Sequence, residues 1–326
     1  SHDHLISPDG CSTPYEFFDI SKTKVLELQK NWVRYIISRW GYATNILSWE
    51  IMNEINLMRL KNTDCDPINL PAPTNLDQNI LDWVNTMYSY IKSIDPNAHL
   101  VTCTPISNTP PNIIVPDVPI DDAASTLFPN KRIIDEITKI MDYTDQHRYT
   151  DPFINHYSYP GFIANNPPSS IIFDYASSYA TYNKPNNISE FTSLCPEPTS
   201  QCAPTAPRMQ VNDPKGFHLH NVLWSSGFSG VMGVGNCWWI DQIIMKYNLD
   251  YNYLALSRYW DGTSFDQDDN VSYGKQTPVY TGSFDCTYYN SGSGPNYYYF
   301  TKNKKEIFGW AQDANFSVER LRDYEI

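Results

Sequence analysis

The stretch Ser48-Trp49-Glu50-Ile51-Met52-Asn53-Glu54 closes a short, mostly apolar run that begins at Asn45. Such a run, preceded by a helix-like segment, is typical of a strand in a parallel sheet that helices cover. In a parallel barrel the reactive groups lie at the carboxyl ends of the strands, so Asn53 and Glu54 have the position of site residues. The alternative interpretation, a helix cap or a solvated chain end, is equally common for an isolated Asn-Glu pair.

Helix-like and strand-like segments alternate on both sides of this stretch. Apolar spacing predicts a helix at 21–40, with Ser21 as its N-cap and Gly41 as its stop, and another at 76–94, which Asp95-Pro96 ends. Further helices are expected near 131–141, 171–182, 216–228 and 253–260, and strands at 45–54, 99–104, 141–149, 187–191 and 230–239. Five strand-helix rounds at this spacing predict an α/β fold with a parallel sheet.

The composition changes after Gly262. Residues 271–326 alternate Tyr, Val and Thr with Gly and Ser turns, and Glu306-Ile307-Phe308-Gly309-Trp310 has the pattern of a strand. We therefore predict a first domain over residues 1–262 and a β-rich extension, or the start of an accessory β domain, over residues 263–326.

Composition limits the possible partners of this 326-residue chain. A net charge of -13 argues against nucleic acid and anionic membranes, because phosphates would be repelled. No run of 18 apolar residues occurs, so we expect no membrane span. The chain has 24 Tyr, 9 Trp and 14 Phe, and flat aromatic faces stack on sugar rings, so the composition favours a carbohydrate ligand, although Tyr-rich surfaces also serve protein interfaces.

Cysteines and glycosylation sequons indicate a secreted or lumenal glycoprotein. The seven cysteines form no C-x-x-C pair, and N-x-S/T sequons occur at Asn187, Asn270 and Asn315. Cys195 and Cys202 bracket a Pro-rich loop and are the first candidates for a disulfide, although connectivity does not follow from sequence. The odd count leaves one thiol free or paired elsewhere, and the Asn187 sequon, inside a predicted strand, is expected to be unused.

Three further motifs accompany Glu54. They are Ile188-Ser189-Glu190-Phe191 at a strand end, His147-x-Tyr149 after a polar-ended strand, and Trp238-Trp239 after a glycine-rich strand. In their order and spacing, these motifs and Trp49–Glu54 resemble clan A glycoside hydrolases, closest to family 5, the cellulase and β-mannanase type. The resemblance covers residues 15–262.

The resemblance implies a (β/α)8 TIM barrel of which this chain holds strands four to eight. It implies Glu54 as acid/base, Asn53 as the residue that holds the sugar 2-hydroxyl, and Glu190 as nucleophile. His147 and Tyr149 would line the cleft, and Trp238 or Trp239 would form the sugar platform. No metal and no cofactor is implied. The expected substrate is a β-linked glucan or mannan.

Two departures from the family pattern stand out. The acid/base Glu is usually followed by Pro, and here Ile55 follows Glu54. The first three strands and the family's arginine near the nucleophile are missing, and the sequence opens on what resembles a loop in progress. We expect an N-terminal segment or another chain to complete the barrel, because an open five-strand remnant would expose unpaired edges.

The expected reaction is retaining hydrolysis, which uses two carboxyl groups about 5 to 5.5 Å apart. The charge of Glu190 would favour the protonated form of Glu54. Each residue has an alternative role: His147 as a hydrogen-bonded core histidine, with His156-Tyr157 as rivals, and Trp238-Trp239 as core. The alternative functions are a non-catalytic glycan-binding or structural extracellular glycoprotein, and a different clan A enzyme of the β-galactosidase or xylanase kind.

Overall fold

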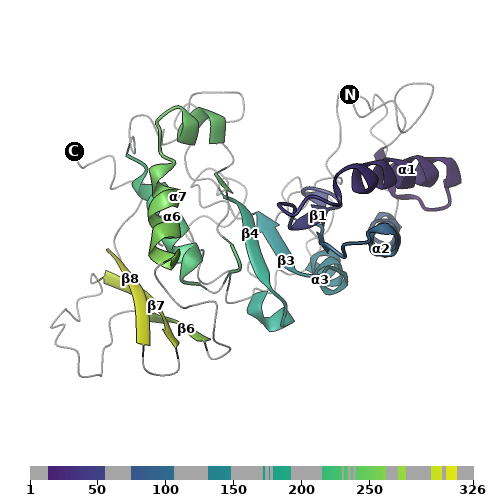
Figure 1. Cartoon of the computed structure of the whole chain (residues 1–326). Helices are drawn as coiled ribbons and strands as arrows, with labels where there is room; N and C mark the ends of the chain where they lie inside the picture. The colour runs from purple at the N-terminus through teal and green to yellow at the C-terminus, as the bar shows by residue number, and fades with distance from the viewer. Residues whose placement is uncertain are drawn as a thin grey trace, which may run out of the picture. The chain divides into compact units, whose positions relative to one another are not determined.

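The computed structural model describes residues 14–55, 75–105, 131–147, 172, 176, 179–191, 215–229, 231–233, 236–237, 240–261, 271–276, 295–302 and 306–313. The chain divides into two units, one of residues 1–107 and 113–146 and the other of residues 108–112 and 147–326. Each unit is described by itself below (Figure 1).

The first unit alternates helices and short strands. In chain order these are the 3-10 helix η2 (Pro14–Phe18), α1 (Thr23–Trp40), β1 (Ser48–Glu50), α2 (Leu76–Ile94), β2 (Leu100–Thr102) and α3 (Lys131–Ile140), with β3 (Thr144–His147) ending at the division between the units. Strands β1 and β2 are parallel, with Ser48 opposite Leu100 and Glu50 opposite Thr102. The helix α2 connects them, as the predicted strand-helix-strand order requires.

The core of the first unit lies between its helices and the β1-β2 sheet. Trp83 of α2 is almost fully buried, and its indole N–H donates to the Gln29 side chain of α1 at 2.8 Å. The other buried side chains of this core include Phe18, Ile37, Ile80, Val84, Met87, Ile91, Val101, Ile137 and Met141. The apolar spacing that predicted the helix at 76–94 therefore reflects its packed face, and the predicted bounds match α2.

One local prediction in this unit is wrong, and one predicted strand is longer than the strand that forms. Helix α1 begins at Thr23 with Lys22 at the N-cap, because the Ser21 hydroxyl instead donates to the Asp19 carboxylate at 2.6 Å. The strand expected at 45–54 is shorter, and its start is open to solvent: β1 spans Ser48–Glu50, and Leu47 is 65% exposed. Among the described residues β1 pairs only with β2, so its other edge has no neighbouring strand to cover Leu47.

Asp142 fixes the start of β3 beside β2. Its carboxylate accepts hydrogen bonds from the Val101 backbone N–H at 2.8 Å, Tyr88 Oη at 2.8 Å and Lys92 Nζ at 3.0 Å. Burial by itself would raise the pKa of Asp142, but the hydrogen bonds from Lys92, Tyr88 and Val101 outweigh it and lower the pKa. Burial, with the hydrogen bond and charge of Asp142, raises the pKa of Tyr88 to about 12.

The second unit contains the strands that follow β3. Its elements are the 3-10 helix η5 (Ala180–Tyr182), β4 (Asn186–Phe191), α6 (Phe217–Gly227), β5 (Asn236–Cys237), the π-helix η6 (Ile240–Met245) and α7 (Tyr251–Asp261). The sheet order is β3-β4-β5, and β4 and β5 are parallel with Glu190 opposite Asn236. The core of this unit includes Ile172, Ile188, Phe191, Leu219, Val222, Leu223, Ile243, Ile244, Leu249 and Leu256.

A separate antiparallel sheet follows α7. Strands β6 (Val271–Gln276), β7 (Pro295–Lys302) and β8 (Glu306–Asp313) lie side by side in that order, drawn in yellow in Figure 1. Strand β8 contains the strand predicted at Glu306–Trp310, and the Trp310 ring lies 6.1 Å from the His220 ring of α6. The role of residues 263–326 as an extension or accessory domain stays a prediction.

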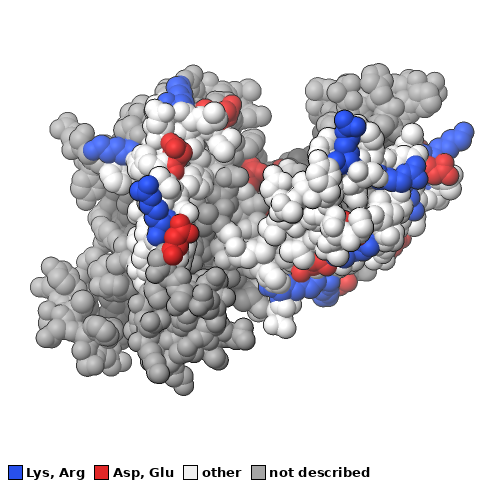
Figure 2. Space-filling view, viewed as in Figure 1, with Lys and Arg blue, Asp and Glu red and all other residues white. Residues whose placement is uncertain are grey.

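The structure bears in part on the expectations about membrane spans, cysteines and charge. Among the helices that the structure describes, none is long and apolar enough to cross a membrane. Cys103 and Cys237 lie within the described residues, are buried and are not joined in a disulfide, whereas Cys195 and Cys202 lie outside the described residues. On the face shown in Figure 2, basic and acidic side chains are interspersed over the described surface.

Candidate active site

Glu54 lies four residues beyond Glu50, the last residue of β1, in a strained backbone conformation. Backbone pairing continues beyond the strand: the Thr104 N–H donates to the Met52 carbonyl at 3.1 Å, and the Ile55 N–H donates to the Thr104 carbonyl at 3.2 Å. Between these bonds Glu54 has a φ of 49°, in the left-handed region. This region costs a non-glycine residue about 1–2 kcal/mol. Such residues persist where the surroundings fix them, often at functional sites.

The environment of Glu54 suits a side chain that meets solvent. Ile55, the next residue, is fully buried in the core, while Asn53 is exposed and Glu54 is half-buried. The buried Ile55 side chain, where the family pattern has Pro, anchors the chain directly after Glu54. Glu54 thus follows a parallel strand, and its role as acid/base stays a prediction.

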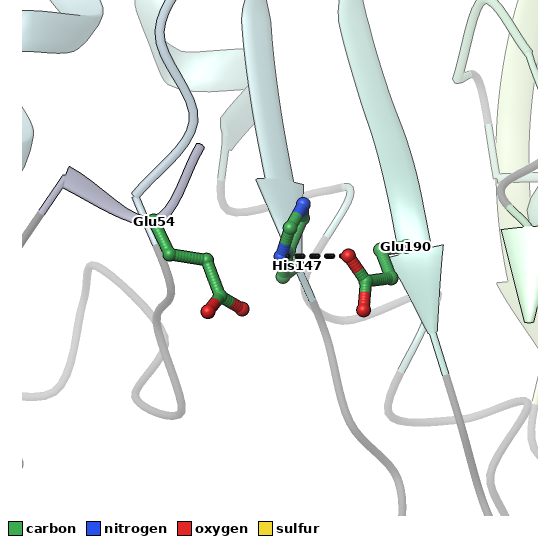
Figure 3. Close-up of side chains that lie close together, drawn as sticks. All are labelled: Glu54, His147 and Glu190. Carbon is green, nitrogen blue, oxygen red and sulfur yellow. Dashed lines mark ion pairs between the residues drawn. The ribbon is translucent and has the colours of Figure 1, made fainter. Parts of the chain in front are cut away.

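His147 and Glu190 form an ion-pair contact in the second unit. His147 Nδ1 lies 3.2 Å from Glu190 Oε2, as the dashed line in Figure 3 shows. The His147 side chain is 2% exposed and the Glu190 side chain 19%. The buried imidazole therefore lies within ion-pair distance of the Glu190 carboxylate.

Local sequence explains the placement of Glu190. In β4 the apolar Ile188 and Phe191 are buried in the core of the second unit, while Glu190 is only half-buried. The strand is held at its start by Asn186, whose carbonyl accepts the Met232 N–H at 2.7 Å and whose amide donates to the Ala176 carbonyl at 3.1 Å. Core packing and these bonds therefore fix the carboxylate of Glu190.

Sequence reasoning missed the buried polar character of β3. All four of its residues, Thr144-Asp145-Gln146-His147, are buried. The Asp145 carboxylate accepts the Gln146 backbone N–H at 2.8 Å. The signal was available: a run of four polar residues after an apolar helix is unusual in a strand, and buried polar groups are the informative ones.

Tyr143 connects β1 to the start of β3 inside the first unit. Its hydroxyl lies 2.8 Å from the Ser48 hydroxyl, and the Thr102 hydroxyl is 3.5 Å from its carbonyl oxygen. Burial is the main cause that raises the pKa of Tyr143 to about 12. Tyr143 is therefore a neutral hydrogen-bonding group at neutral pH.

The remaining predicted site residues lie outside the described part of the chain. These are Tyr149, Trp238 and Trp239, together with the rivals His156 and Tyr157. Their roles stay predictions. Glu54 belongs to the first unit, and His147 and Glu190 belong to the second. His147 and Glu190 are also residue types that can ligate a metal ion, so a cation is a second candidate ligand for this pair.

Comparison with known proteins gives distant structural neighbours. No family model and no curated protein matches the sequence. A solved endo-β-1,4-mannanase from Thermotoga petrophila is similar at 14% identity and a TM-score of 0.45, with 92% of this chain and 73% of that chain covered. A β-glucuronidase from Bifidobacterium dentium has 13% identity and a TM-score of 0.38, with 67% of this chain covered.

These neighbours are glycoside hydrolases. The chain covers 28% of the Bifidobacterium dentium enzyme and 30% of a Ruminococcus gnavus β-glucuronidase, so it spans less than a third of their length.

Proposed function

We propose that this chain carries the catalytic residues of a retaining β-glycoside hydrolase of clan A, of the family 5 type, with Glu54 as acid/base and Glu190 as nucleophile. The observation that carries the proposal is the contact of buried His147 with half-buried Glu190 on β4. A nucleophilic carboxylate has to be ionised and fixed, and a hydrogen-bonding imidazole supports both requirements.

The resemblance to clan A glycoside hydrolases is the ground for pairing Glu54 with Glu190. In a parallel barrel the carboxyl ends of the strands meet at one face. An acid/base after β1 would then act on the same sugar as the nucleophile on β4.

In the first step, the Glu190 carboxylate attacks the anomeric carbon. Protonated Glu54 gives its proton to the departing glycosidic oxygen, so the C–O bond breaks as the bond to Glu190 Oε forms. In the second step, Glu54, now ionised, takes a proton from water. That water attacks the anomeric carbon and releases Glu190, so the anomeric configuration is retained.

The remaining predicted residues would supply substrate binding. Asn53 adjoins Glu54 and is exposed, which suits a donor to the sugar 2-hydroxyl. The aromatic residues Tyr149, Trp238 and Trp239 would stack on sugar rings. We propose a β-1,4-linked glucan or mannan as the substrate, in agreement with the aromatic-rich composition, and a secreted or lumenal location, for which the cysteines and the N-x-S/T sequons are the ground.

The test is hydrolysis of a panel of β-linked polysaccharides and aryl glycosides by the native protein and by Glu54→Gln and Glu190→Gln variants. Both substitutions keep the side-chain shape and remove the acid or nucleophile, so we expect a loss of several orders of magnitude. Glu136→Gln, on the exposed surface of α3, is the matched control and should keep full activity. NMR of the first product should show the retained anomer.

The alternative, a non-catalytic glycan-binding glycoprotein, predicts a different outcome. In that case the native protein would bind glycan in calorimetry without turnover on any substrate, and both glutamine variants would bind as well as the native protein. Loss of activity after EDTA treatment, restored by a divalent cation, would contradict the two-carboxylate mechanism and favour a metal at His147 and Glu190.

A further inference from the structure

Thr104, two residues beyond the end of β2, has a buried hydroxyl group. The side chain is fully buried, and no group within the described part of the chain forms a hydrogen bond with its Oγ1 atom. Buried polar side chains nearly always have a partner, so an exception requires an explanation. Valine has nearly the same shape without the hydroxyl and would suit a purely structural position better. The hydroxyl at this position therefore indicates a function.

Thr104 pairs with the part of the chain that contains the candidate acid/base. The Thr102 carbonyl accepts the Ile51 N–H at 2.8 Å, so regular parallel pairing would bring the N–H two residues after Ile51 to the Thr104 carbonyl. That carbonyl instead accepts the N–H of Ile55, four residues after Ile51, at 3.2 Å. The chain beyond β1 therefore holds two extra residues opposite Thr104, and Glu54 belongs to this bulge. Bulges next to active sites redirect a side chain.

The packing of neighbouring residues indicates that the Thr104 hydroxyl and Glu54 lie on the same side of the sheet. Cys103 packs into the core of the first unit, so Thr104, directly after it, points to the opposite side. Ile55 packs into the same core, and Glu54, directly before it, is only half-buried. Neighbouring strands lie about 4.7–4.9 Å apart, so the long side chain of Glu54 can reach a hydroxyl on the adjacent strand by a change of rotamer.

We propose that Thr104 is a positioning residue for Glu54, an inference that rests on the proposed role of Glu54 as acid/base. Glu54 gives its proton to the departing glycosidic oxygen as the C–O bond breaks, and its carboxyl group becomes a carboxylate. The Thr104 hydroxyl then donates a hydrogen bond to this carboxylate and keeps its own proton. Because this bond forms with the charge that develops during proton transfer, it stabilises the transition state more than the resting protein.

The experiment compares two substrates that differ in their need for an acid. The phenyl β-glycoside of cellobiose or mannobiose has a leaving group that needs a proton, whereas the 2,4-dinitrophenyl glycoside of the same sugar reacts without one. Thr104→Val should lower kcat/KM about tenfold for the phenyl glycoside, the order of magnitude that a hydrogen bond to a charged group provides, and less than about twofold for the dinitrophenyl glycoside. A general loss of structure would lower both rates equally.

Two matched variants accompany Thr104→Val. Thr104→Ser keeps the hydroxyl and should restore the native ratio of the two rates. Thr102→Val makes the same change on β2, but the Thr102 hydroxyl already donates to the Tyr143 carbonyl at 3.5 Å, so the ratio should stay native. The melting temperature adds a measurement that needs no turnover: Thr104→Val should not lower it, because the resting protein loses no hydrogen bond.

Three results would overturn the inference. A native ratio of the two rates in Thr104→Val, in a protein that Glu54→Gln inactivates, would overturn it and leave the proposed function standing. A lower melting temperature of Thr104→Val would show that the hydroxyl is already bonded in the resting protein. Full activity of Glu54→Gln on the phenyl glycoside would overturn the proposed function and this inference together.

Discussion

Replacing Asp142 by alanine should loosen the junction of β2 and β3 more than any surface change. The Asp142 carboxylate accepts three hydrogen bonds, from the Val101 backbone, Tyr88 and Lys92. Val101 is fully buried, so its N–H loses its acceptor and cannot turn to water. The Lys92 side chain is 30% exposed and can be rehydrated, so its loss counts for less.

The expected cost follows from these contacts. A buried N–H without an acceptor costs about 1–3 kcal/mol, and a hydrogen bond to a charged group contributes about 1.5–3 kcal/mol, with incomplete additivity. We expect Asp142→Ala to lower the free energy of opening at this junction by about 3 kcal/mol. Since each 1.4 kcal/mol is about a factor of ten, amide exchange at Val101 should accelerate by about two orders of magnitude.

Hydrogen exchange of the peptide that contains Val101 measures this effect directly. Glu136→Ala is the control, because its ion pair with Lys139 is exposed and contributes little to stability. An acceleration below about fivefold in Asp142→Ala, or an equal one in the control, would refute the reasoning. It would mean that water replaces the carboxylate at Val101.

Substitutions at three other positions probe backbone strain and burial. Ala98 is exposed and has a φ of 53°, a conformation that glycine adopts without strain. Ala98→Gly should therefore raise the free energy of unfolding in urea titrations by about 0.5–1 kcal/mol, a figure that already allows for the larger entropy of glycine in the unfolded chain. A loss of stability would contradict this expectation. Glu54 has a φ of 49°, so Glu54→Gly should be about 1 kcal/mol more stable than Glu54→Ala, and both variants should be inactive. Equal stability of the two variants would argue against backbone strain at this position. Burial lowers the pKa of His220 below its usual 6.5, so the unfolded chain binds the proton more readily and the stability of the fold should fall as pH drops from about 6.5. Between pH 7 and pH 5 the melting temperature should therefore fall less in His220→Phe than in the native protein. An equal fall in both proteins would show that another group causes it.

Periodic apolar segments were predictable from sequence because local spacing encodes the packed face. The helix at 76–94 has the same bounds in the structure, the strands at 99–104 and 141–149 contain β2 and β3, and the strand at 187–191 lies within β4. Turn and cap details were less predictable. Ser21 binds Asp19 and not the start of α1, a choice between two nearby acceptors that spacing cannot decide.

The candidate site, like the fold, was predictable from sequence only in part. Sequence placed Glu54 and Glu190 at strand ends; in the structure Glu190 lies near the end of β4, whereas Glu54 lies four residues beyond the last residue of β1. It could not give the 3.2 Å contact of His147 with Glu190, because residues 43 positions apart meet only through the sheet. Nor could it give the left-handed backbone at Glu54, which arises from the hydrogen bonds of Met52 and Ile55 with Thr104.

Sequence by itself determined the alternation of helix and strand, the acidic and aromatic-rich composition, and two glutamates at the ends of apolar runs, because these properties are local. Tertiary structure alone decided which charged groups are paired and which apolar residues stay exposed. Asp142 is held by three partners far from it in the chain, and Trp32 has the apolar character of a core residue yet lies in solvent. Burial and pairing depend on neighbours distant in sequence, so no window of sequence contains them.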